Sequence, residues 1–248
     1  MELSILPVAG LPEVTAGADL ASLIWSALSA HAMSLAAGDV VVIAQKVVSK
    51  AEGRLVAIAD LVPSSLAEGL AVRTGKPANK VEAILRESRR VVRAAPGVLI
   101  TETRHGYVCA NAGVDESNVP GAKLCLLPED TDASARGIRA RLRELAGVDL
   151  AVIVSDTFGR ARRIGQTNVA IGVAGMSPWC DYRHRPDDFG VPLQVTQIAV
   201  ADELAGAAEL VMGKAERVPV AIVRGYQYEP REGAATDLVR PATEDLFR

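Results

Sequence analysis

The run from Leu150 to Val154 constrains the fold more than any other stretch of the chain. It is a short, unbroken series of apolar residues, several of them β-branched, and Val40 to Ala44 has the same character. Continuous apolar runs of this length are typical of strands that are covered on both faces. With 248 residues, the chain is long enough to bury such strands in a sizeable core. We therefore expect a sheet with other structure packed against both of its sides.

Polar and charged residues follow the run at 150–154 directly. Asp156 and Thr157 stand where the chain leaves the core. The predicted loop that follows carries three arginines, Arg160, Arg162 and Arg163. A carboxylate beside a hydroxyl suits a hard divalent cation, whereas arginines suit phosphate or carboxylate oxygens. This pattern favours a metal–phosphate site. The alternative is that Asp156 caps the following turn and the arginines form a solvated face.

Two other polar segments follow predicted strands. The segment after Val40 to Ala44 contains Gln45, Lys46, Ser49 and Lys50. It could bind a phosphate, or it could be an ordinary edge hairpin, since charged side chains often guard strand edges. The second segment runs over residues 111–118 and places Asp115 just after a strand. Asp115 could ligate a metal or could close an Asx-turn.

Periodicity and turn residues predict strands and helices that are interspersed along the chain, in one large domain or two interlocked halves. The predicted strands cover residues 3–8, 40–44, 98–101, 107–110, 122–127, 150–154, 169–173, 191–200 and 218–224. The predicted helices cover 19–32, 63–75, 77–90, 132–145 and 201–212, with Asp19 as one N-cap and Asp132 or Ser134 as another. Residues 179–190 are predicted to form an irregular loop that could act as a lid.

Composition excludes several classes of function. The net charge is −3 and aromatic residues make up only 4% of the chain, which argues against binding to nucleic acid or to a membrane surface. The three cysteines are sparse and form no CxxC pair, and we see neither a signal peptide nor a membrane-length apolar run. We therefore expect a cytoplasmic protein. The P-loop, GxGxxG, HExxH and GxSxG motifs are all absent.

Six segments occur in an order that resembles the coenzyme F420 gamma-glutamyl ligase family. They are ILPVAGLPE near the start, VVSKAEGR at 47–54, NAGVDESNV at 111–119, VIVSDTFGR at 152–160, VADELAGAAELVMGK at 200–214 and VAIVRG at 220–225. The resemblance covers nearly the whole chain. It corresponds to the ligase domain, without the nitroreductase-like domain that follows it in actinobacterial relatives.

The resemblance implies a reaction and a set of ligands. Enzymes of this family use GTP and Mg²⁺ or Mn²⁺ to add L-glutamate to a deazaflavin coenzyme precursor through an acyl phosphate, with K⁺ as a candidate additional ion. They have an α+β fold with mixed sheets and flanking helices, and they form an intertwined homodimer. The resemblance therefore implies this fold, in one domain over residues 1–248. A ligase for another carboxylate substrate, or a non-catalytic nucleotide-binding subunit, are the alternative functions.

The resemblance also implies roles for particular residues of this chain. Asp115, Asp156 and Thr157 are the expected metal ligands, and Asp115, Asp156 and Lys50 are the expected catalytic residues. The expected nucleotide contacts are Ala9, Gly10, Leu11, Pro12, Gln45, Lys50, Asn118, Met212, Gly213 and Lys214. From the residues themselves, we expect Arg160, Arg162 and Arg163 to hold an anionic group of the precursor or of glutamate, or to be a solvated face.

Overall fold

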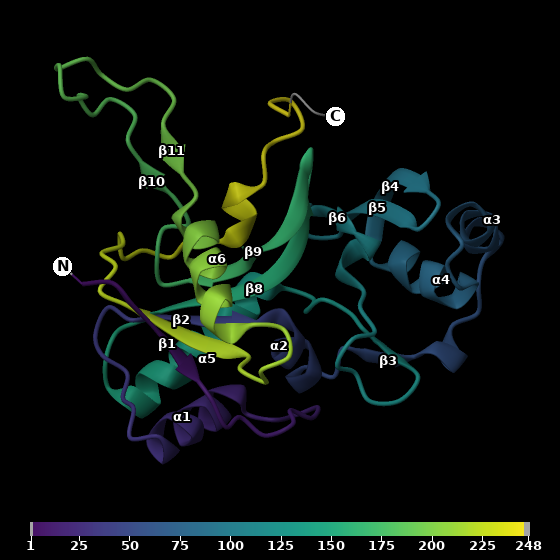
Figure 1. The fold of residues 1–248 in the computed structure, drawn as a ribbon, viewed down its shortest axis with the longest axis horizontal. Coiled ribbons are helices and arrows are strands. Elements are labelled where there is room, and N and C mark those ends of the chain that lie inside the picture. The colour runs from purple at the N-terminus through teal and green to yellow at the C-terminus, as the bar shows by residue number, and fades with distance from the viewer. Residues whose placement is uncertain (1, 246–248) are drawn as a thin grey trace.

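The computed structural model describes residues 2–245, and its centre is a five-stranded mixed sheet (Figure 1). The strand order is β1-β12-β2-β8-β9, in which β2 and β8 run parallel and the other neighbours run antiparallel. These strands are β1 (Ser4–Val8), β2 (Val40–Ala44), β8 (Ala151–Arg160), β9 (Arg163–Ala174) and β12 (Val220–Arg224). The α+β fold class with mixed sheets is therefore confirmed.

Helices cover both faces of this sheet, as the continuous apolar runs predict. Alternate residues of β2 and β8, such as Val41 and Val152, pack with α1 (Leu20–Ala30) and α5 (Thr131–Ala146) in one core cluster. Their neighbours in sequence, such as Val42, pack with α6 (Val200–Met212) in a second cluster on the opposite face. Because successive side chains of a strand point to opposite faces, both sets have to be apolar.

Most residues between 55 and 126 form a second unit with its own core, drawn at the right of Figure 1. A two-stranded ladder of β3 (Leu55–Ala57) and β7 (Lys123–Cys125) joins it to the rest of the chain. The remaining elements are α3 (Ser65–Thr74), α4 (Ala78–Arg86), β4 (Ser88–Ala95), β5 (Val98–Thr103), β6 (Val108–Ala110) and the short turns η1 (Ile58–Asp60) and η2 (Asn111–Gly113). Strand β5 lies between β4 and β6 in one sheet.

A long arm projects from the central unit between β9 and α6 (Figure 1). Its base is a short ladder of β10 (Cys180–Asp181) with β11 (Gln197–Ile198). The predicted strand at 191–200 is wrong over most of its length, because only its residues 197 and 198 pair within a ladder of this kind. The arm ends just before α6, and the segment after β12 includes the turn η3 (Ala235–Leu238). No helix within residues 2–245 is long and apolar enough to cross a membrane.

The predicted helix at 77–90 is too long. Helix α4 ends at Arg86, and the hydroxyl of Ser88 donates to the carbonyl of Ile84 at 2.6 Å, which satisfies one of the last carbonyl groups. The chain then continues as β4, whose β-branched residues Val91 and Val92 favour an extended backbone.

The predicted cap of the helix at 132–145 is also wrong. Asp130 is the N-cap of α5, and its side chain accepts a 2.8 Å hydrogen bond from the amide of Ala133. Asp132 is buried instead, where it accepts hydrogen bonds from the amides of Val173 and Ala235. Several acceptors lie next to each other here, so tertiary packing decides which of them caps the helix.

The predicted loop over residues 155–168 is wrong as well. These residues continue the antiparallel pairing of β8 with β9, in which Thr157 lies opposite Asn168. The pairing extends beyond the covered part of the sheet, where the hairpin becomes exposed and its residues become polar. Only the turn between Arg160 and Arg163 lies outside the two strands.

Candidate active site

The parallel pair of β2 and β8 brings two functional segments to one edge of the sheet. Ala44 lies opposite Ser155 in this ladder, so that Gln45 and Asp156 follow at the carboxyl ends of both strands. Such edges are where α/β sheets place their ligands. Residues 45–51 form the helix α2 (Gln45–Ala51), which excludes the edge-hairpin alternative for this segment. Lys46 and Lys50 lie four residues apart on α2 and are therefore neighbours on its surface.

The second unit carries Asp115 to the same edge. Backbone hydrogen bonds of 3.0 and 2.8 Å tie Asp115 to Cys125 of β7, and β7 pairs with β3, which follows α2 closely. Gln45 strengthens this connection, because its buried amide group donates to Ser49 Oγ at 2.6 Å and to the carbonyl of Leu126 at 3.2 Å. The predicted nucleotide contact Gln45 thus has its amide directed into the protein.

Lys46 forms an ion pair with Asp115, from Nζ to Oδ2 at 2.7 Å. The other carboxylate oxygen of Asp115 accepts from the amides of Glu116 and Ser117 at 2.7 and 3.0 Å, so the Asx-turn alternative is present together with the ion pair. Burial by itself raises the pKa of Asp115, but the hydrogen bonds from Lys46 and Ser117 outweigh it and lower this pKa to about 2. Asp115 is therefore a stable anion.

Asp156 has a different environment. Within residues 2–245, no lysine or arginine forms an ion pair with it, and its Oδ1 accepts from the amide of Thr157 at 2.8 Å. Burial, assisted by the charge of Asp115, raises the pKa of Asp156 to about 6, although Lys46 and Lys214 act in the opposite direction. The two carboxylates and the two lysines therefore share one electrostatic environment.

Thr157 adds a hydroxyl group to this edge. Its Oγ1 donates to Asn168 Oδ1 at 2.7 Å and accepts from the ammonium of Lys214, which also lies 3.3 Å from Asn168 Oδ1. Lys214 comes from the loop after α6, where Gly213 has a positive φ of 60° and its Cα faces the Glu216 carboxylate closely. The predicted residues Thr157 and Lys214 thus contact each other, and Met212 is buried beside them at the end of α6.

Lys50 lies on the side of α2 that faces the loop after β1. Its side chain is buried and forms an ion pair with Glu13, directly after the predicted nucleotide-binding residues 9–12. Gly10 adopts a φ of 81°, and a Cβ atom there would lie 2.9 Å from the ring of His31, so this turn requires glycine. Asn118 is exposed at a positive φ of 56° in the loop that carries Asp115.

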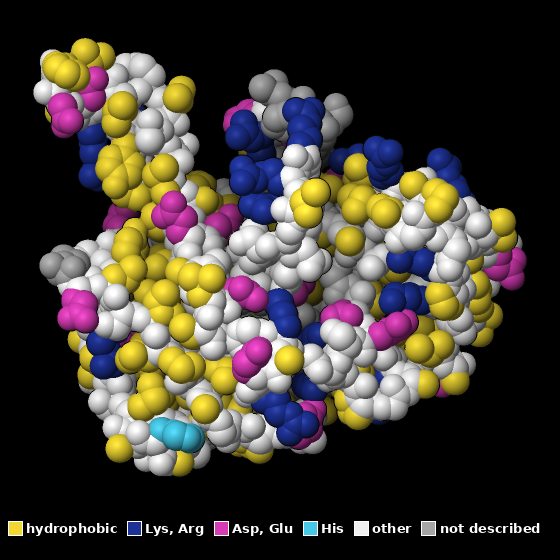
Figure 2. All heavy atoms as spheres, viewed as in Figure 1, with side chains coloured by type: hydrophobic (Ala, Val, Ile, Leu, Met, Phe, Trp, Pro, Cys, Tyr) yellow, Lys and Arg dark blue, Asp and Glu magenta, His cyan; other side chains and the backbone are white. Residues whose placement is uncertain are grey.

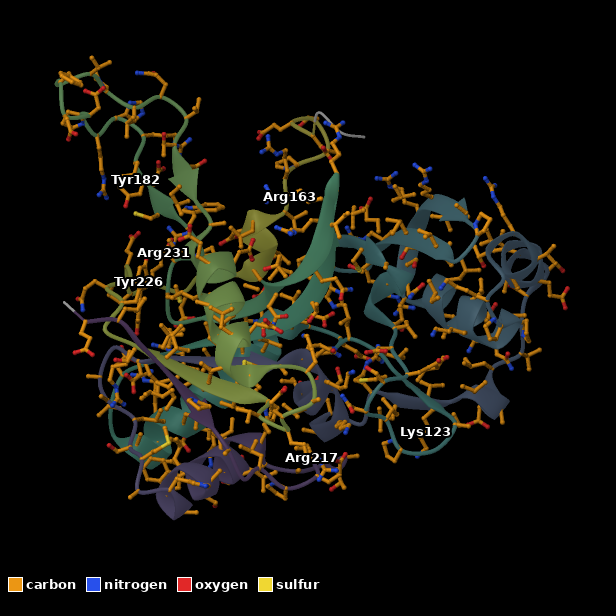
Figure 3. All side chains as sticks on the ribbon, in the orientation of Figure 1. Lys123, Arg163, Tyr182, Arg217, Tyr226 and Arg231 are labelled. Carbon is orange, nitrogen blue, oxygen red and sulfur yellow. The ribbon has the colours of Figure 1, made fainter. Side chains whose placement is uncertain are left out.

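The three arginines at the end of the β8–β9 hairpin are far from this edge. Arg160 is four residues beyond Asp156, about 13 Å along the strand, and its guanidinium donates to the carbonyl of Ile164 within the hairpin. Figure 3 shows Arg163 at the far end of the hairpin, close to the C-terminal segment and away from Arg217 in the loop after α6. The structure thus does not bring these arginines together with the carboxylates.

Two site residues carry no clear sequence signal for their role. Asn168 is buried and meets Thr157 only through the register of β8 with β9. Cys109 of β6 lies close enough to Asp156 for the charge of that carboxylate to act on its thiol. Burial, together with this charge, raises the pKa of the Cys109 thiol to about 12. One sequence feature could have indicated the site role of Lys46, namely its four-residue spacing from Lys50 on a helix. The described residues contain no group of three or more His, Cys, Asp and Glu side chains that could hold a metal by themselves.

Comparisons with known proteins point to one family. Residues 10–225 match the model of the family described as F420-0:Gamma-glutamyl ligase. The chain is 48% identical to the coenzyme F420:L-glutamate ligase of Methanothermobacter thermautotrophicus over 100% of both chains. It is also 48% identical to the ligase of the same name from Methanopyrus kandleri, over 99% of this chain and 98% of the relative, and 41% identical to that of Archaeoglobus fulgidus, over 100% and 97%.

Proposed function

The chain belongs to the F420-0:gamma-glutamyl ligase family, and on this basis we propose that it joins L-glutamate to a deazaflavin coenzyme precursor. The proposed co-substrate is GTP, and the proposed metal is Mg²⁺ or Mn²⁺, with K⁺ as a candidate additional ion. The names of the full-length relatives, each a coenzyme F420:L-glutamate ligase, support the choice of coenzyme and amino acid. Joining a carboxylate to an amine in water needs a driving force, and transfer of a phosphoryl group from GTP would supply it.

One observation carries the proposal for the metal. Asp115 and Asp156 come from different units of the fold, yet their charges act on each other at one sheet edge, and the hydroxyl of Thr157 lies at the same edge next to Lys214. Two carboxylates and a hydroxyl fit Mg²⁺ or Mn²⁺, which need few protein ligands when phosphate oxygens and water complete their shell. Asp115, Asp156 and Thr157 would hold the metal, which would supply positive charge against the phosphates.

The proposed reaction has two steps. The γ-phosphoryl group of GTP moves to the precursor carboxylate, which gives GDP and an acyl phosphate. The amine of glutamate then attacks the acyl carbon, loses a proton and displaces inorganic phosphate. Lys50 and Lys214 supply positive charge for the phosphate oxygens, and residues 9–12 and Asn118 line the nucleotide. Such positioning and charge neutralisation account for most of catalysis in phosphoryl transfer.

We also propose that the chain works as a homodimer in the cytoplasm. The arm between β10 and β11 supports the dimer, because it exposes apolar side chains that a lone chain leaves in water, including Phe189 at 92% and Val195 at 85% exposure. Figure 2 shows hydrophobic side chains at the surface of the projecting arm. Exposed apolar residues in a contiguous patch mark interaction surfaces.

The test is to incubate the protein with precursor, GTP, Mn²⁺ and glutamate, with and without K⁺, and to identify the product by mass spectrometry. We expect a mass increase of one or more glutamate residues, and GDP formation that requires both precursor and glutamate. Nucleotide binding without any amide product would favour a non-catalytic nucleotide-binding subunit. An amide product on another carboxylate would redirect the substrate assignment and leave the reaction class intact.

A further inference from the structure

The loop that carries Asp115 accepts all the hydrogen bonds that the ammonium of Lys46 can donate. Lys46 Nζ lies 2.7 Å from Asp115 Oδ2, 2.7 Å from Ser117 Oγ and 2.8 Å from the carbonyl oxygen of Ser117. A lysine ammonium has three N–H donors and no acceptor, so these contacts use its full capacity. The side chain of Lys46 is 20% exposed and that of Asp115 is 47% exposed, so the ion pair is only partly shielded from solvent. Lys46 comes from α2, whereas the loop belongs to the second unit of the fold.

Lys46 contacts Oδ2 of Asp115, which is the carboxylate oxygen available to a cation. Oδ1 is already engaged within its own turn by the amides of Glu116 and Ser117. Oδ2 accepts from Ser117 Oγ at 2.6 Å and from Lys46. A divalent ion that binds Asp115 through Oδ2 therefore meets a positive charge on the same atom. The two cations cannot both hold this oxygen closely, because they repel each other at contact distance.

We propose that Lys46 is a tethered cation that holds Oδ2 of Asp115 in the absence of metal and competes with the divalent ion for this oxygen. The inference rests on the proposed metal site. It gives a physical reason for placing a lysine among metal ligands: two carboxylates near each other destabilise the metal-free protein unless a nearby cation offsets their repulsion, and Lys46 pairs directly with one of them. Lys46 supplies that cation from within the chain, and the divalent ion displaces it.

A purely structural role for Lys46 makes the opposite prediction. If Lys46 only fastens the loop to α2, its loss loosens the loop and weakens metal binding. If Lys46 competes with the metal, its loss strengthens metal binding. The sign of the change in affinity therefore separates the two roles without any measurement of catalysis.

Lys80 provides the matched control. Its ammonium lies 3.1 Å from Glu116 Oε1, so it ties the same loop to α4 through an acid outside the proposed ligand set. We would measure Mn²⁺ binding to the full chain without nucleotide, from the electron paramagnetic resonance signal of free Mn²⁺. The variants are Lys46→Met, Lys46→Arg and Lys80→Met. The melting temperature of each, with and without Mn²⁺, is the second measurement.

We expect Lys46→Met to lower the dissociation constant for Mn²⁺ about tenfold, as removal of one charge beside a partly shielded site implies. Lys46→Arg and Lys80→Met should stay within about twofold of the parent protein. Lys46→Met should also melt at a lower temperature without metal and gain more from Mn²⁺ than the parent does.

Unchanged or weaker Mn²⁺ binding by Lys46→Met overturns the inference. If the parent protein binds Mn²⁺ and Asp156→Asn abolishes that binding, such a result leaves the proposed metal site intact and rejects only the competition by Lys46. If neither the parent nor Lys46→Met binds Mn²⁺ without nucleotide, the inference fails, because it concerns the nucleotide-free protein. The proposed metal site is then tested separately, by whether amide formation with GTP requires Mn²⁺.

Discussion

Thr157 and Asn168 face each other across the β8–β9 pair, and the hydroxyl of Thr157 donates to the amide oxygen of Asn168 at 2.7 Å. The same amide oxygen lies 3.3 Å from the ammonium of Lys214. Asn168 thus fixes the orientation of one proposed metal ligand and of one proposed nucleotide contact. It is buried, so the bond geometry does not depend on solvent.

Replacement of Asn168 by alanine should therefore reduce turnover about 10-fold to 100-fold, as is typical for residues that orient metal ligands. The control is Gln166→Ala, an exposed residue on the same face of β9, which should leave turnover unchanged. Steady-state kinetics with varied Mn²⁺ would locate the effect. Equal turnover in the two variants would show that Asn168 does not position Thr157 for the reaction.

The two carboxylates should be indispensable for turnover. We expect Asp156→Asn and Asp115→Asn each to lower kcat by roughly a hundredfold or more, because each loses a charge that holds the proposed metal. Asp188→Asn on the arm is a suitable control, since this exposed acid lies outside the site. Glutamate-dependent phosphate release measures the effect. Turnover near that of the parent protein in either variant would refute its assignment as a metal ligand.

The raised pKa of Asp156 makes a prediction for stability. Its pKa is about 6 in the folded protein and ordinarily 3.8, so the folded state binds this proton more tightly than the unfolded state. Ionisation of Asp156 therefore destabilises the metal-free fold. This effect is complete above pH 6 and absent below about pH 3.8. Asp156→Asn should raise the free energy of unfolding at pH 7.5 by about 1–3 kcal/mol.

Urea unfolding in the presence of a chelator, at pH 7.5 and at pH 4, measures this difference. The gain from Asp156→Asn should shrink as the pH falls through 6 and nearly vanish at pH 4. A gain that is the same at both pH values would point to better packing of the amide and not to relief of a buried charge.

Lys50 offers a test of the nucleotide assignment. Lys50→Met keeps the length of a buried side chain but removes its charge, so it should raise the KM for GTP at least tenfold if this ammonium meets the phosphates. Glu13→Gln is the control, because it breaks the same ion pair from its exposed partner. If both variants change KM equally, the ion pair and not the lysine charge is responsible.

The arm should govern the state of association. Phe189→Ser together with Val195→Ser removes the most exposed apolar side chains of the arm without altering its base at β10 and β11. We expect this double variant to shift a dimer toward monomer in light scattering coupled to size-exclusion chromatography. Val72→Ser, which removes a comparably exposed residue from α3, should not have this effect. An unchanged mass would reject the arm as the interface.

The sequence by itself determined the buried strands, the main helices and the family. Continuous apolar runs such as those at 40–44 and 150–154 are typical of strands that are covered on both faces, and the structure packs different helices on these two faces. The N-cap at Asp19 likewise depends only on local sequence, because its side chain accepts a hydrogen bond from the amide of Ser22, three residues later. The order and spacing of the motifs were enough to identify the family, because the motifs extend over nearly the whole chain.

Only the tertiary structure decided what depends on contacts between distant residues. Asp130, and not Asp132, caps α5 because Asp132 binds amides of β9 and of the C-terminal segment. Lys46 meets Asp115 because the β3–β7 ladder carries that loop back to α2, and Thr157 meets Asn168 through strand register. Local sequence sets the conformations a segment prefers, whereas partners for charged and polar side chains depend on which distant segments the core brings together.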